Sequence, residues 1–131
     1  MRTVHYIVGL LGVTLFALSG QVLLHHHPPL RSLDPTVHLM YVSRHIYLLG
    51  ISLVNLSLGL YLRSESTQWR HLLQNLGSVF LVTSPLLLAA AFLIEPSYGL
   101  AGRTWWSKFG LFTMLGGVVA HFIASAGTRE T

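Results

Sequence analysis

The sequence predicts an all-α integral membrane protein, in which four antiparallel transmembrane helices form an up-down-up-down bundle. Charged residues make up only 9% of the 131 residues, against about 25% in soluble proteins, and apolar residues make up 52%. The apolar residues gather in four stretches of roughly 20 residues or more, enough to cross about 30 Å of hydrocarbon. Short connections make neighbouring helices antiparallel. We therefore expect one four-helix transmembrane domain over residues 1–131.

The first span is predicted over residues 4–24, preceded by the single cation Arg2. A cleaved signal peptide is the alternative, because Ala17-Leu18-Ser19 weakly resembles a small-residue cleavage site. Three further apolar segments follow in the chain, which favours an uncleaved first span.

The second and third spans are predicted over residues 37–62 and 72–94. The second opens on Ser43-Arg44-His45 before becoming apolar. The third contains Pro85, which lacks a backbone donor and crowds the carbonyl of Leu81, so we expect a kink there. We also expect the neighbouring Thr83 and Ser84 to satisfy the freed backbone groups.

The fourth span is predicted over residues 105–126 and opens on Trp105-Trp106, since indole rings favour the membrane interface. Its small residues Gly116, Ala120 and Ala124 recur every four positions, which lets another helix approach closely. Besides the lipid bilayer, this stripe therefore predicts a membrane-protein partner or a homo-oligomer.

Four spans place both termini on one side of the membrane, and the distribution of cations bears on which side that is. The side of the termini would hold Arg2, Arg63, Arg70 and Arg129; the other would hold Arg31, Arg103 and Lys108, with Arg44 at the membrane edge. This small excess favours cytoplasmic termini. We expect the protein in a plasma membrane, such as the bacterial inner membrane.

Several functions lack their components in this chain. With no cysteine, disulfides and thiolate metal sites are excluded. The net charge of +4 is spread over single cations, so no basic block indicates nucleic-acid binding. The four acidic residues, Asp34, Glu65, Glu95 and Glu130, are far apart in sequence, and phosphate-loop, His-Glu-x-x-His and serine-nucleophile motifs are absent. We therefore do not expect a self-contained hydrolytic enzyme.

Histidine is the unusual residue, with eight in the chain. His25, His26 and His27 lie in the first connection, and His38 lies seven residues before His45, on the same helix face. Such a group predicts a transition-metal site of copper or zinc type. The alternative is a solvated loop whose imidazoles lie among lipid headgroups.

His5 and His121 form a second pair, because antiparallel first and fourth helices would bring them to similar depth. Two opposed histidines can hold haem b in the core of a helical bundle. The alternative is that each caps its helix end and extends to the interface.

Arg44 is the most informative single residue, since a cation inside a membrane span is costly and usually points inward to a partner. One interpretation is contact with a substrate, a quinone or a haem propionate, together with His45. The other is structural: an ion pair with Glu95 or Asp34 that fixes helix packing, or a side chain that extends to the membrane interface.

Three functional hypotheses follow from these patterns. The first is a non-enzymatic accessory or helix-packing subunit of a membrane assembly. The second is a redox bundle holding haem b or a transition metal, and the third is a small oligomeric transporter that uses Arg44 and Pro85.

Overall fold

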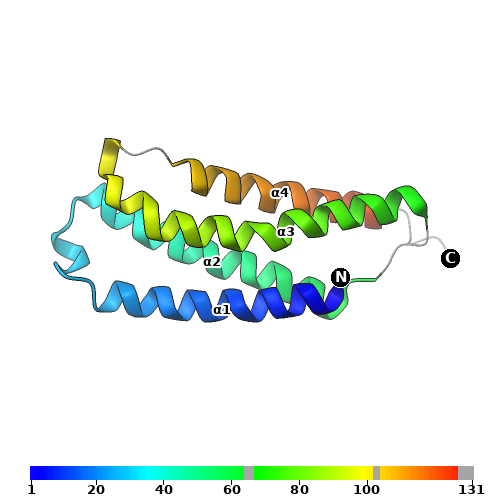
Figure 1. The fold of residues 1–131 in the computed structure, drawn as a ribbon, viewed down its shortest axis with the longest axis horizontal. Helices are drawn as coiled ribbons and strands as arrows, with labels where there is room; N and C mark the ends of the chain where they lie inside the picture. The colour runs from blue at the N-terminus through cyan, green and yellow to red at the C-terminus, as the bar shows by residue number, and fades with distance from the viewer. Residues whose placement is uncertain (64–66, 102–103, 127–131) are drawn as a thin grey trace.

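Four long antiparallel helices form a bundle in the computed structural model, which describes residues 1–63, 67–101 and 104–126 (Figure 1). The helices are α1 (Arg2–Leu24), α2 (Pro35–Tyr61), α3 (Gln68–Ile94) and α4 (Trp105–Ser125), with short 3-10 helices η1 (Leu30–Ser32) and η2 (Glu95–Ala101). All four are long and apolar enough to cross a membrane. The predicted fold class is thereby confirmed. Glu65, Arg103, Arg129 and Glu130 lie outside the described residues.

Three helices begin earlier than their apolar stretches indicate: α1 at Arg2, α2 at Pro35 and α3 at Gln68. α2 starts at Pro35 because Asp34 caps it: Asp34 Oδ1 accepts a hydrogen bond from the Thr36 backbone N–H at 2.8 Å. Proline at the first helical position costs nothing, since that N–H has no partner in the helix. α3 likewise starts at Gln68 rather than Leu72. Hydropathy marks the part of a helix suited to lipid, whereas the helix itself continues to its cap.

Glycines let the helices pack as two tight pairs, α1 with α2 and α3 with α4. A Cβ added at Gly59 would lie 2.7 Å from the backbone nitrogen of Tyr6, and one at Gly117 would lie 2.8 Å from Gly77 O. Real Cβ atoms do not approach so closely, so each backbone contact requires glycine. Contacts between α2 and α3 join the two pairs.

The small-residue stripe on α4 packs inside the chain. Ala120 and Ala124 are buried, and the Cβ of Ala120 lies 3.0 Å from the Cβ position built on Gly77 of α3. Gly117, rather than Gly116, meets the backbone of α3. Binding of a partner through this stripe stays a prediction.

The apolar side chains divide between a narrow core and a wide outer surface. Buried residues at the centre are Leu48, Ile51, Leu81, Leu88 and Phe92. Side chains such as Phe112 and Phe122 on α4 are 70% and 73% exposed. An outer surface this apolar suits lipid rather than water.

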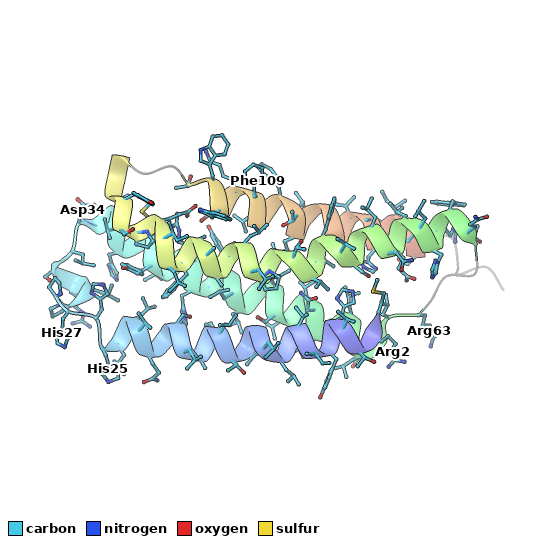
Figure 2. All side chains as sticks on the ribbon, in the orientation of Figure 1. Arg2, His25, His27, Asp34, Arg63 and Phe109 are labelled. Carbon is cyan, nitrogen blue, oxygen red and sulfur yellow. The ribbon has the colours of Figure 1, made fainter. Side chains whose placement is uncertain are left out.

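The two ends of the bundle differ in what they carry. Arg2 and Arg63 lie at the end that holds the N-terminus, which we call the terminal end; His25, His27 and Asp34 lie at the opposite end, the loop end (Figure 2). Arg2 Nη2 donates a hydrogen bond to Leu60 O at 2.8 Å. A cation there complements the carbonyls at the C-terminus of α2.

Candidate functional site: two buried polar clusters

An ion pair between Arg44 and Glu95 forms the centre of the loop-end cluster. Arg44 Nη2 lies 2.6 Å and Nε 2.7 Å from Glu95 Oε2, and both side chains are almost fully buried. Arg44 Nη1 donates to Met40 O at 3.1 Å and to Ser43 Oγ at 3.2 Å. Glu95, not Asp34, is therefore the partner of Arg44.

Glu95 also connects this ion pair to α4. Its Oε1 accepts a hydrogen bond from the Ser107 backbone N–H at 2.9 Å, and its Oε2 accepts one from Ser107 Oγ. Ser107 lies in the first turn of α4, where a negative charge is favourable beside the free N–H groups. One carboxylate thus joins α2, the end of α3 and the start of α4.

His45 lies next to Arg44 in sequence but belongs to a separate contact with α1. Its Nδ1 lies 2.8 Å from Ser19 Oγ, and its ring stacks on Phe16 with centroids 4.1 Å apart. Ser19 Oγ donates its only proton to Phe16 O at 2.9 Å, so it accepts from His45 Nδ1–H. Arg44 and His45 therefore do not converge on one site.

The loop histidines are also directed at separate partners. His25 Nδ1 donates to Gln21 O at 3.0 Å, and His26 Nδ1 donates to Pro28 O at 2.8 Å. His27 is exposed, and His38 is half-buried on α2. Over residues 1–63, 67–101 and 104–126, no three His, Cys or acidic side chains are grouped so as to hold a metal ion. Metal binding by these histidines stays a prediction.

Pro85 has a direct consequence for the second buried cluster. Proline has no N–H, so the carbonyl of Leu81, one turn earlier in α3, loses its helical donor. Asn55 of α2 supplies a replacement, since its Nδ2 donates to Leu81 O at 2.9 Å and to Ile51 O at 3.1 Å. We expected Thr83 and Ser84 to do this, but Thr83 bonds Val79 O and Ser84 bonds Gly110 O on α4.

The terminal-end cluster is a chain of hydrogen bonds through all four helices, made by Asn55, His5, Ser78 and His121. Asn55 Oδ1 lies 2.7 Å from His5 Nδ1, and His5 Nε2 lies 2.9 Å from Ser78 Oγ. Ser78 Oγ lies 3.1 Å from His121 Nε2. The predicted proximity of His5 and His121 is confirmed: their ring centroids are 5.9 Å apart, and both side chains are buried.

The positions of the protons in this hydrogen-bond chain follow from the orientation of the Asn55 side chain. Its amide nitrogen faces two carbonyls, so its oxygen must face His5, whose Nδ1 then carries the proton. A neutral His5 accepts the Ser78 hydroxyl proton at Nε2. Ser78 Oγ in turn accepts from His121 Nε2–H, which leaves His121 Nδ1 with a free lone pair.

The fit of haem between His5 and His121 can be tested against these bonds. The Nε2 atom of each ring bonds the same hydroxyl, Ser78 Oγ. Iron ligation by both Nε2 atoms would break both hydrogen bonds and displace Ser78 from between the rings. The arrangement as it stands does not fit a haem there.

Sequence reasoning found most of the polar residues but missed three hydroxyls. Asn55 and Ser78 stand out in the sequence, because a polar side chain inside an apolar span usually bonds across helices. Ser19 and Ser107 were missed, as was Ser52, which bonds Leu48 O within α2. Serine is common in apolar helices, so the sequence does not distinguish Ser19 and Ser107, which bond other elements, from Ser52, which bonds its own helix.

Comparison with known proteins adds no relative. The chain matches no protein-family model, and no curated protein or solved structure is significantly similar to it.

Proposed function

We propose that this chain is a non-enzymatic accessory subunit, which packs beside another membrane protein or a second copy of itself. The Arg44–Glu95 ion pair carries the proposal, because the one buried cation of the described bundle is directed at the chain's own carboxylate. Three nitrogen atoms of Arg44 already have partners within the chain. This use of Arg44 supports helix packing over ligand binding.

The outer face of α4 is the surface that we assign to such packing. It carries large apolar side chains, among them Phe109, Phe112 and Phe122, each more than half exposed. Aromatic side chains contribute large contact areas between proteins. Because the connections between the helices are short, most of the surface that the bundle offers for contacts lies on the helices themselves.

A photocrosslinker on this face tests the proposal in native membranes. Benzoylphenylalanine at Phe112 should give one protein adduct of fixed mass, while the same group at Leu11 of α1, which is also exposed, should give little. A homo-oligomer would give an adduct of twice the chain mass. The proposal would be contradicted if the crosslinker at Phe112 gave no adduct, or if both positions gave adducts in equal amounts.

Haem binding is the second candidate, favoured by the pairing of His5 and His121 at 5.9 Å between ring centroids. It requires Ser78 to leave the space between the rings. A Soret band in the purified protein that shifts on reduction with dithionite, and that is lost in His121→Ala, would establish it. A colourless protein with no bound metal would exclude the redox functions.

A further inference from the structure

A groove runs between α2 and α4 at the terminal end of the bundle. It consists of two adjoining cavities of about 330 and 320 Å³, which share Leu58 and His121 in their linings. The outer cavity carries the polar side chains of Tyr61, Arg63 and Gln74. The inner one is mainly apolar, and Leu53, Val54 and Val118 form much of its wall. Both cavities are open to the surface of the bundle, and each volume lies at the lower end of the range for small-molecule sites.

One polar atom of His121 opens into this groove. Its Nε2 bonds Ser78, and no hydrogen bond from the described residues reaches its Nδ1. In the same part of the chain, every fully buried side-chain nitrogen or oxygen has a partner. Nδ1 is therefore not enclosed, and the cavities that its ring lines give access to it.

The hydrogen-bond chain sets what Nδ1 can bind. Asn55 fixes the proton on His5, His5 fixes the direction of the Ser78 hydroxyl, and Ser78 fixes the proton on His121 Nε2. Nδ1 is then an acceptor, so a ligand must donate a hydrogen to it. The hydrogen-bond chain ends at the side-chain amide of Asn55, which does not relay protons. It therefore positions His121 rather than conducting protons across the membrane.

The charge at the mouth of the groove and the position of His121 along α4 narrow the class of ligand that can donate to Nδ1. Arg63 at the mouth of the groove disfavours a cationic head, and a carboxylate or phosphodiester anion has no hydrogen to donate. His121 lies four residues before the last residue of α4, which is about 6 Å along the helix axis. A neutral hydroxyl head at that depth would direct its tail towards the apolar wall at Leu53 and Val118.

We propose that this groove binds a neutral, lipid-soluble alcohol or phenol, whose hydroxyl donates to His121 Nδ1 and whose apolar tail lies along α2 and α4. His121 is the binding residue. His5, Asn55 and Ser78 are positioning residues, which act by holding His121 in one tautomer. The assignment is independent of the accessory role.

A matched pair of photoactivatable probes tests the donor requirement. Hexadecanol and its methyl ether, each with a diazirine near the oxygen, would be added to the full chain in phosphatidylcholine vesicles. We expect saturable labelling around His121 by the alcohol, about tenfold stronger than by the ether, the effect of one hydrogen bond. Equal labelling by the two probes would overturn the proposal.

Two tryptophan variants test where the alcohol binds without changing any residue of the hydrogen-bond chain. Val118→Trp fills the apolar cavity and should abolish saturable labelling, whereas Leu115→Trp, on the exposed face of the same helix, should leave it unchanged. Unchanged labelling in Val118→Trp would place the alcohol elsewhere and overturn the assignment.

Ser78→Ala tests the positioning role through a spectroscopic signature. With ¹⁵N-labelled histidine, His121 should show a bare Nδ1 in the unsubstituted chain and a shift of that resonance when unlabelled hexadecanol is added. Ser78→Ala should give mixed tautomers and reduce the preference for alcohol over ether. A protonated Nδ1 in the unsubstituted chain would contradict the tautomer on which the proposal depends.

Discussion

The Glu95 side chain connects α2 and α4 at the loop end of the bundle. It is 1% exposed and bonds both Arg44 and Ser107, so its removal leaves a buried cation without a counter-charge. We expect Glu95→Gln to lower the free energy of unfolding by about 3 kcal/mol. Denaturant titration in detergent micelles measures this loss.

The control for this substitution is Asp34→Ala at the same end of the bundle. It removes only the cap of α2 and should cost about 1 kcal/mol. If Glu95→Gln proves no more harmful than Asp34→Ala, the ion pair contributes little to the fold.

Asn55 and Pro85 are predicted to be energetically coupled through one carbonyl. Asn55→Ala leaves Leu81 O without its donor and should cost about 2 kcal/mol. Pro85→Ala restores a backbone N–H to that carbonyl, so the double variant should lose less stability than the sum of the single variants. A double-mutant cycle measures the coupling, and strict additivity would show that Asn55 does not replace the missing N–H.

At the scale of helices, glycine decides how closely α1 and α2 approach. Gly59→Ala places a Cβ 2.7 Å from the backbone of Tyr6 and should destabilise the bundle by about 1–3 kcal/mol. Gly50→Ala on the same helix meets nothing within 4 Å and should stabilise it by up to about 1 kcal/mol. Thermal unfolding of the two variants side by side gives the comparison. Equal effects would mean that the close approach is not required.

Helix extents illustrate what an apolar stretch can and cannot specify. The predicted ends at residues 24, 94 and 126 agree with Leu24, Ile94 and Ser125 to within one residue. The starts of α1, α2 and α3 were placed late, because Arg2, Asp34-Pro35 and Gln68 are polar or turn-forming residues that a hydropathy pattern assigns to a loop. For α2 the Asp34 cap supports the extra turn, whereas Thr67 makes no side-chain cap bond to α3.

At the scale of the whole molecule, the fold makes a topological prediction that the absence of cysteine makes easy to test. A cysteine at His27 and one at Thr3 lie at opposite ends of the bundle. With cytoplasmic termini, we expect His27→Cys to react with an impermeant maleimide in intact cells, and Thr3→Cys only after permeabilisation. The reverse pattern would invert the orientation. Equal reactivity would show that α1 does not cross the membrane.

The amino-acid sequence by itself determined the number of helices, their antiparallel order and the level along the bundle at which His5 and His121 meet, because lipid demands apolar runs of fixed length. It did not determine partners. Only the tertiary structure decided that Asn55 bonds Leu81 O, that Ser78 lies between the two histidines and that Ser107 bonds Glu95. Partner choice depends on the rotation of each helix about its axis, and a helix that is apolar all round does not encode that rotation.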